Sequence, residues 1–252
     1  MKQPLRRLYR NSLILGIPML AAVSTFSATV RNSAETSDVD TFNIKSHHQE
    51  DSLRYRTLTI NDYAEVADEL GISVACIRAV VDIEAGVKNK GFNADNTPLV
   101  NFDLTMFRQA AGRHGINLNK YKASHPVVFA PLNVKKYGSH QAAQYARLNS
   151  AMSIDTVCAM ESTFWGMFQI GGFNWKLCGC GSVREFVHRV SYSEREQLEL
   201  FADFIRARNL VGYLKNREWD KFSLRYNGPG YAKRGYDRRM AAAYAKYSKQ
   251  EK

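Results

Sequence analysis

The chain has 252 residues, of which 45% are hydrophobic, and a formal net charge of +11. This length excludes an array of many domains, because it holds one large domain or two small ones. Only one part of the sequence is convincingly globular, and the charge alone identifies no partner, because charge also serves solubility.

The first 28 residues have the layout of a secretory signal. Four basic residues lie among the first ten, and residues 13–30 are apolar or small, which corresponds to a basic n-region followed by an apolar h-region. Cleavage after residue 27 or 28 leaves Phe26 at a position where a small residue is preferred. An uncleaved membrane anchor through residues 5–30 is therefore the alternative. Both forms predict export to the periplasm, the cell envelope or the medium.

Residues 29–54 are predicted to form a polar linker, and residues 55–252 the globular domain. The linker is poor in apolar residues, so it cannot offset the entropy of ordering. Its adjacent His47 and His48 have no third ligand nearby, and we expect no metal and no cofactor. The exported part keeps a charge of about +7 without the four cations of the first ten residues. Such a protein meets anionic envelope polymers rather than nucleic acid, and we expect a monomer.

Helical spacing of apolar residues dominates the globular part, and no stretch combines sustained period-two alternation with hairpin turn chemistry. We therefore predict a mainly α fold. The expected helices are 61–70, 73–85, 104–114, 140–149, 153–161, one after each S-x-x-E pattern at Ser182 and Ser193, 219–226 and 236–247. Residues 86–102 are rich in Gly, Asn and Pro, and we expect a loop or a small β element there.

The helix expected at 73–85 ends an apolar stripe with a carboxylate. Counted from an N-cap at Ser73, the apolar residues 74, 77, 80 and 81 share one face with Glu84. Desolvation disfavours a charged carboxylate and raises its pKa, which suits a general acid near neutral pH. Glu84 is therefore the first candidate for a catalytic residue.

The four cysteines allow up to two disulfide bridges in an oxidising compartment. Cys76 and Cys158 fall within apolar helical patterns, where a free buried thiol is an equal alternative. Cys178 and Cys180 are too close in sequence for a usual zinc knuckle, and no metal site is expected from them.

Two further blocks combine aromatic rings with side-chain amides. Residues 165–170 read WGMFQI, with Gln169 as the single polar side chain, and residues 226–231 read YNGPGY, starting with Tyr226 and Asn227. Aromatic faces beside amides are typical of sugar sites. Each block also has a structural interpretation, the first as the start of a core helix and the second as a turn with core tyrosines.

Together and in chain order, these motifs resemble the N-acetylmuramidase domain of bacterial and phage endolysins, in the lysozyme-like superfamily. The matching features are the helix-ending Glu84, Gly91-Phe92, residues 98–103, residues 162–174 and residues 226–231. The similarity runs from about residue 58 to residue 247. It implies a lysozyme-like helical domain with a small loop or β element beside the active-site cleft. It also implies hydrolysis of the β-1,4 bond between N-acetylmuramic acid and N-acetylglucosamine in peptidoglycan, with Glu84 as general acid.

The same resemblance implies roles for the other motif residues. Gln169 and Asn227 would hold the acetamido groups of the sugar or position water, and Tyr226 would orient Glu84 or stack on a sugar. The aromatic side chains that would line the groove, or belong to the core instead, are Phe102, Phe164, Trp165, Phe173 and Trp175. Two departures concern substrate detail: Thr105 stands where the family commonly has histidine, and residues 88–90 read Lys-Asn-Lys where shorter Ser/Gly-rich spacing is usual.

A second carboxylate has several candidates. Inverting glycosidases place acid and base about 6.5 to 9.5 Å apart, and retaining enzymes place acid and nucleophile at about 5 to 5.5 Å. Asp103 is the first choice, because it follows the loop after Glu84. Glu161 is a rival for the acid itself, and Asp82 is expected to be solvated or ion-paired. In a fourth case no second carboxylate acts, as in lytic transglycosylases, which give 1,6-anhydro products. A peptidoglycan-binding protein without catalysis is the remaining alternative.

Overall fold

The structure is a computed structural model that describes residues 54–85 and 90–250. The signal or anchor predicted at residues 1–28, nearly all of the linker at 29–54, both linker histidines and most of the Lys-Asn-Lys insertion lie outside the described residues. Within the described ranges, no helix is both long enough and apolar enough to span a membrane.

The fold is mainly α with one small sheet, as predicted. In chain order the elements are α2 (Ile60–Leu70), α3 (Val74–Glu84), β1 (Val100–Phe102), α4 (Leu104–Arg113), the 3-10 helix η2 (Leu118–Tyr121), α5 (Pro126–Phe129), α6 (Val134–Tyr137), α7 (His140–Met152), α8 (Thr156–Glu161), β2 (Thr163–Trp165), β3 (Ile170–Gly171), the 3-10 helix η3 (Gly172–Asn174), α9 (Val183–Val190), α10 (Glu194–Ala207), α11 (Val211–Lys215), α12 (Trp219–Asn227), α13 (Tyr231–Arg234) and α14 (Tyr236–Ser248).

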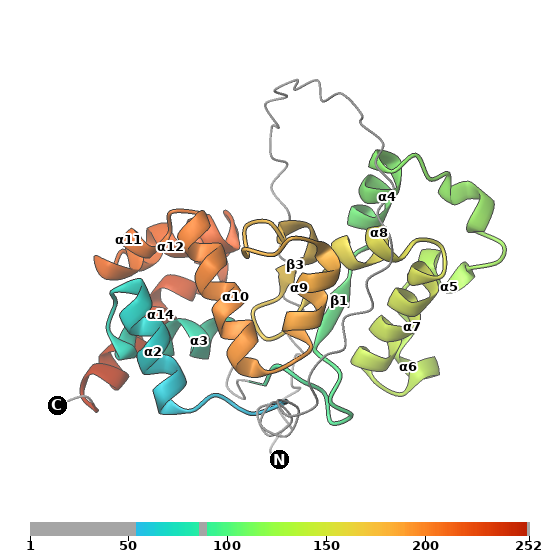
Figure 1. The fold of residues 1–252 in the computed structure, drawn as a ribbon. Coiled ribbons are helices and arrows are strands. Elements are labelled where there is room, and N and C mark those ends of the chain that lie inside the picture. The colour runs from blue at the N-terminus through green and yellow to red at the C-terminus, as the bar shows by residue number, and fades with distance from the viewer. Residues whose placement is uncertain (1–53, 86–89, 251–252) are drawn as a thin grey trace, which may run out of the picture.

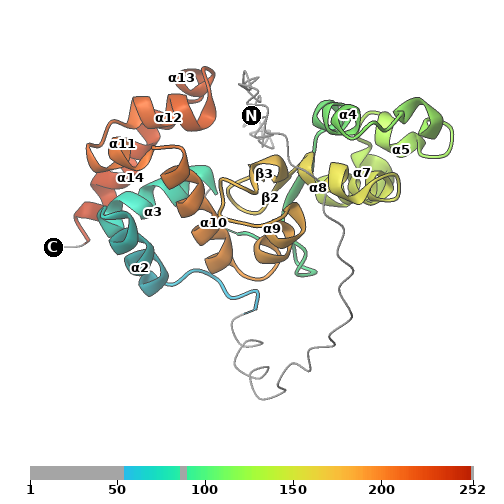
Figure 2. The ribbon, with the colours of Figure 1, turned by 45° about the horizontal axis from the view of Figure 1, so that its top comes forward.

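The helices form two groups, and the sheet lies between them (Figures 1 and 2). The large lobe contains α2, α3 and α10 to α14, with α14 packed along α3. The small lobe contains α4 to α7, and α7 packs against β1. The helix α9 lies beside α10 and η3, next to the sheet.

Local sequence signals set the bounds of the predicted helices. The Ser73 hydroxyl accepts a hydrogen bond from the Cys76 N–H at 3.2 Å and so caps α3, as expected. Gly71 ends α2 with φ +60°, in the left-handed region where glycine is favoured. Ser182 and Ser193 cap α9 and α10 in the same way. Asp155 caps α8, which begins at Thr156, so the helix predicted from residue 153 starts three residues later.

The small β element expected within residues 86–102 is β1, and it belongs to a sheet with two further strands that the sequence did not predict. The sheet has the order β1-β2-β3, with both pairs antiparallel. Val100 pairs with Trp165, and Trp165 pairs with Ile170. The interpretation of residues 165–170 as the start of a core helix is therefore wrong. Gly166 (φ +69°) and Gln169 (φ +50°) adopt the left-handed region, which makes this segment a turn between strands.

All four cysteines are buried, and none forms a disulfide in the structure. Burial raises the pKa of the Cys158 thiol to about 12, and it also raises the pKa values of the Cys178 and Cys180 thiols. A thiol with a raised pKa is protonated near neutral pH and therefore a weak nucleophile. The alternative of buried thiols without bridges is the one that this structure adopts.

Candidate active site

Glu84 lies at the C-terminal end of α3, where the apolar stripe ends. The stripe is buried as predicted, because Ile77, Val80 and Val81 have no exposed surface, while Glu84 itself is half-buried. Burial raises the pKa of the Glu84 carboxyl to about 7. A position in the last turn of a helix also disfavours negative charge, because the unpaired helix carbonyls point that way. Glu84 can therefore hold a proton near neutral pH.

The carboxyl group of Glu84 is held by residues from the C-terminal part of the chain. Asn227, the last residue of α12, donates a hydrogen bond from Nδ2 to Glu84 Oε1 at 2.9 Å. This bond and the positive charge of Arg239 on α14 both lower the pKa of Glu84, but by less than burial raises it. The structure thus brings Glu84 and Asn227 together, although 143 positions separate them in the sequence.

Tyr226 lies beside this pair and connects it to the turn between β2 and β3. Its hydroxyl donates to the backbone carbonyl of Phe168 at 3.2 Å. Its ring stacks on Phe222 with a centroid distance of 5.5 Å and meets Phe201 edge-on. Burial raises the pKa of the Tyr226 hydroxyl, and the nearby carboxylate of Glu84 raises it further. Tyr226 is therefore a neutral hydrogen-bond donor whose partner is the turn.

Gln169 occupies the end of that turn and is half-buried. Its Nε2 donates to the Gly166 carbonyl at 2.8 Å, across the turn. Because Phe168 accepts the hydrogen bond from Tyr226, Gln169 is adjacent in sequence to a residue that contacts the Glu84–Asn227 site. The side-chain amide that the sequence singled out thus stabilises an unusual backbone conformation.

The aromatic candidates differ in exposure. Phe102 is 3% exposed and Trp165 is 4% exposed, and Trp165 Nε1 donates to the Met160 carbonyl at 3.0 Å. Such burial favours the core role for both residues, since little ring surface is left for a sugar. Phe173, by contrast, is 40% exposed and lies edge-on against Phe164. Phe173 therefore offers an accessible aromatic face, and Trp175 is partly exposed as well.

Asp103, the first choice for the second carboxylate, follows β1 and caps α4. Its Oδ1 accepts a hydrogen bond from the Met106 N–H at 2.9 Å. The turn at 166–169 lies at the other end of β1, where the Gly166 N–H donates to the Leu99 carbonyl. Asp103 is three positions further along the chain than Val100, which corresponds to about 10 Å in a strand. The charge of Asp103 also acts on the half-buried Arg147.

The other two carboxylates that the sequence analysis considered are bound by side chains of the protein. Glu161, the rival for the acid, pairs with Arg113 at 3.2 Å and lies 3.9 Å from the ring nitrogen of His114. Asp82 accepts a hydrogen bond from the Tyr247 hydroxyl of α14. Glu84 differs from both in that its partner is the side-chain amide of Asn227.

Two buried polar residues near the site escaped the sequence analysis, namely Glu194 and Gln197 on α10. Gln197 could have been found by the pattern that indicated Glu84, which is a polar side chain on an apolar helical face. It occupies the helical face of the buried Leu200 and Phe201, three and four residues later. A polar side chain on an apolar stripe needs a specific partner, and Gln197 has several, which are described below. Arg239 gave no comparable signal.

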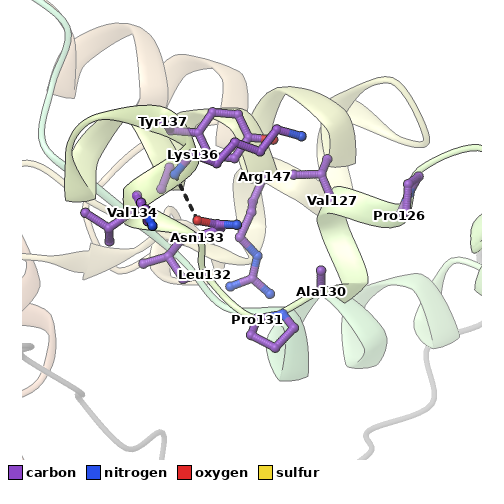
Figure 3. Close-up of a pocket in the computed structure, with 12 residues that line it drawn as sticks. Pro126, Val127, Ala130, Pro131, Leu132, Asn133, Val134, Lys136, Tyr137 and Arg147 are labelled. Atoms are coloured by element: carbon purple, nitrogen blue, oxygen red, sulfur yellow. Dashed lines mark hydrogen bonds between the residues drawn. The ribbon is translucent and has the colours of Figure 1, made fainter.

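A cavity of about 650 Å³ lies in the small lobe. Residues of α5, α6, α7 and the segments between them line it, and Figure 3 shows Arg147 beside Ala130, Pro131 and Leu132. Arg147 Nη2 donates to the Val128 carbonyl at 3.0 Å. Glu84, in the large lobe, is not among the residues that line this cavity, so the cavity is separate from the candidate active site.

Comparisons with known proteins show the family to which the chain belongs. The family model described as N-acetylmuramidase matches residues 73–248, a range that begins at the α3 cap and ends in α14. Among solved structures, the chain is similar to the Burkholderia AP3 phage endolysin, with 38% identity, a TM-score of 0.66, and coverage of 78% of this chain and 73% of that chain. No curated protein matches the chain. The chain therefore belongs to the N-acetylmuramidase family of the lysozyme-like superfamily, and it is a glycoside hydrolase that acts on peptidoglycan.

Proposed function

We propose that the enzyme cleaves the β-1,4 bond between N-acetylmuramic acid and N-acetylglucosamine, with Glu84 as general acid. The observation that carries this proposal is the place of Glu84 at the end of α3, where Asn227 binds its carboxyl at 2.9 Å and burial raises its pKa to about 7. A general acid works best when its pKa lies near the operating pH. Glu84 is also the residue at the position of the helix-ending glutamate in the family motif.

The hydrogen bond from Asn227 indicates how the proton is presented. Asn227 donates to Glu84 Oε1, so in the protonated acid the proton resides on Oε2, which is then the donor toward the glycosidic oxygen. Proton transfer accompanies breakage of the bond between the anomeric carbon and that oxygen. Water then adds its hydroxyl to the anomeric carbon, and a proton returns to Glu84.

The neighbouring polar groups are proposed to bind the sugar. Asn227 keeps one amide oxygen for an acetamido group or a water molecule while its Nδ2 holds Glu84. Gln169 is carried to the same region by the turn that Tyr226 contacts. We assign Tyr226 to holding this turn, and Phe173 to the stacking of a sugar ring, since it is the exposed aromatic residue next to β3.

Asp103 is proposed as the second carboxylate, because it follows the loop after Glu84 in the chain and its side chain is only half-buried at the end of β1. One observation favours a second candidate function, that of a lytic transglycosylase. Asp103, Glu161 and Asp82 each have a structural partner. If none of them takes part, the substrate itself must complete the reaction and the product carries a 1,6-anhydro end.

We further propose that the protein is exported and acts in the cell envelope, on the basis of the basic and apolar segments in residues 1–28. The monomeric state stays a prediction. Amino-terminal sequencing of the protein recovered from the envelope and from the medium tests this proposal. A start near residue 29 indicates cleavage, whereas an intact start in the membrane fraction indicates an anchor through residues 5–30. Recovery only from the cytoplasm contradicts export.

Mass spectrometry of the soluble products from purified peptidoglycan tests the reaction. The wild-type protein is compared with the Glu84→Gln variant, which keeps the size of the side chain and an acceptor for Asn227. Reducing N-acetylmuramic ends that vanish in the variant are the expected result. Anhydro ends would assign the second candidate function. Equal products from both proteins would overturn the role of Glu84, and no products from either would indicate a binding protein.

A further inference from the structure

Gln197 of α10 is a buried polar residue that the proposed reaction does not use. Its side chain is 1% exposed, and its Oε1 accepts a hydrogen bond from the Met167 N–H at 2.7 Å. Its Nε2 donates to the Val190 carbonyl at 2.8 Å and, at 3.4 Å, to the Gly91 carbonyl. One side-chain amide thus joins three backbone segments that are far apart in the sequence.

Glu194, one helical turn before Gln197, also binds the backbone of Gly91. It is 3% exposed, and its Oε1 accepts a hydrogen bond from the Gly91 N–H at 2.8 Å. Its Oε2 accepts from the Leu58 N–H at 3.0 Å. Gly91 is therefore bound through both its N–H and its carbonyl, seven positions after Glu84.

Two glycines make room for this amide. A Cβ atom at Gly91 would lie 2.4 Å from Gln197 Oε1, and one at Gly166 would lie 2.7 Å from the same atom. Real Cβ atoms do not approach a heavy atom so closely. The close fit shows that Gln197 fills the space between Gly91 and the turn at 166–169.

The turn that Gln197 binds is connected to the general acid. Phe168 follows Met167, stacks on Phe201 of α10 at a centroid distance of 4.4 Å, and accepts the hydrogen bond from Tyr226. Tyr226 is followed by Asn227, which donates to Glu84. A shift of the turn would therefore move the acceptor of Tyr226 and, through α12, the group that holds the acid.

We propose that Gln197 is a positioning residue of the reaction, which fixes the turn at 166–169 against Gly91 and so sets Tyr226 and Asn227 around Glu84. This inference rests on the proposed role of Glu84. Among the charged groups, Arg239 on α14 acts on Glu84 and lowers its pKa, and the Glu84 carboxylate in turn raises the pKa of Tyr226 on α12. Without Gln197 the turn and the end of α12 are expected to shift, which admits water to the carboxyl and also loosens the hydrogen bond from Asn227. Because burial affects the pKa of Glu84 more than this hydrogen bond does, the pKa should fall from about 7 toward its usual value of 4.5.

The Gln197→Met variant tests this proposal, since it keeps an unbranched side chain of similar size and removes all the hydrogen bonds. We expect kcat/KM to fall by about 10- to 100-fold, mainly through kcat, because misplacement by about 1 Å costs that much. We also expect the alkaline limb of the pH–rate profile to move down by roughly one pH unit. The matched control is Gln144→Met on α7, which loses buried hydrogen bonds to the Phe102 N–H and to Asn101. It should lower the unfolding temperature similarly and leave the alkaline limb in place.

A second variant disturbs the contact between Gln197 and Gly91 by a change at Gly91. Gly91→Ala places a methyl group against Gln197 Oε1 and should move the alkaline limb in the same direction, even if Gln197→Met does not fold. An unchanged limb in both folded variants, with only a lower unfolding temperature, would overturn the positioning role. Glu84→Gln, measured in parallel, separates the two proposals. If that variant stays active, the proposed function fails; if it is inactive while the limb is unchanged in the other variants, only the inference about Gln197 fails.

Discussion

The end of α3 and the start of α10 each carry a glutamate that is withdrawn from solvent, and the two environments differ in hydrogen-bond donors and in helix polarity. Glu194 is the first residue of α10, near the positive end of the helix dipole, and it accepts backbone N–H groups from Gly91 and Leu58. Glu84 is the last residue of α3, near the negative end of the dipole, and it accepts a side-chain amide from Asn227.

Burial raises the pKa of both carboxyl groups, but two backbone donors oppose the shift at Glu194, and the pKa of Glu84 reaches about 7. The same side chain thus anchors the backbone at Glu194, and at Glu84 it is the proposed proton donor. Hydrogen bonding to the charged form is what separates the two roles.

Exchange of each glutamate for glutamine gives the largest expected effects. Glu84→Gln should lower the rate of peptidoglycan hydrolysis by at least about 10²- to 10⁴-fold, the usual contribution of a general acid, with little loss of stability because Asn227 keeps an acceptor. Glu194→Gln should instead lower stability by about 1–3 kcal/mol, because an NH₂ group then faces a backbone N–H. Turbidity loss of a peptidoglycan suspension and thermal unfolding measure the two effects. A stable but inactive Glu194→Gln together with an active Glu84→Gln would reverse the assignment.

Asp103 extends the comparison to a third carboxylate. Asparagine is as good an N-cap as aspartate, so Asp103→Asn keeps the cap of α4 and removes only the charge. If Asp103 is the second carboxylate, the rate should fall by about 100-fold at an unchanged unfolding temperature. Asp103→Ala, the matched variant, should lose the rate and also about 1 kcal/mol of stability. Full activity of Asp103→Asn would assign Asp103 to capping alone and favour substrate-assisted chemistry.

The mainly α fold and the candidate acid Glu84 could both be predicted from local patterns in the sequence. The fold is confirmed, and the role of Glu84 stays a prediction. The stripe before Glu84 and the cap at Ser73 predicted α3 within one residue at its C-terminal end. The turn at 166–169 was not predicted, because its apolar residues look like a helix start. Its two left-handed positions, Gly166 and Gln169, become necessary only when β2 and β3 pair.

The sequence also did not predict the contacts between segments that are far apart in the chain. Tyr226 was expected to orient Glu84 or to stack on a sugar, and its hydroxyl donates to the Phe168 carbonyl, 58 positions away. A backbone acceptor has no residue identity, so no sequence motif reveals it. The partner of Glu84 within the family motif, Asn227, could be named as a site residue, but its hydrogen bond to Glu84 required the fold.

Removal of the Asn227 amide, which binds Glu84, should lower the rate less than the changes at Glu84 and Asp103 do. It should also shift the pH dependence of the rate measurably. The hydrogen bond from Asn227 lowers the pKa of Glu84, so Asn227→Ala should raise this pKa and move the alkaline limb of kcat/KM to higher pH. The rate at the optimum should fall by roughly tenfold, as the carboxyl loses its orientation. This shift is opposite in sign to the one expected for Gln197→Met. A limb that moves down in Asn227→Ala would mean that Asn227 mainly excludes water.

The smallest expected effect is on stability, and it follows from the sign of the shift at Glu84. Its pKa is raised from 4.5 to about 7 in the folded protein, so between these pH values the folded state binds a proton that the unfolded state has lost. The contribution of Glu84 to stability therefore decreases as pH rises from about 4.5 through 7. Glu84→Gln lacks this titration, while Glu194 titrates alike in both proteins. The unfolding temperature of the variant minus that of the wild type should thus increase between pH 5 and pH 8. A constant difference would mean that Glu84 titrates normally, and it would remove the contrast with Glu194 on which its assignment as the acid depends.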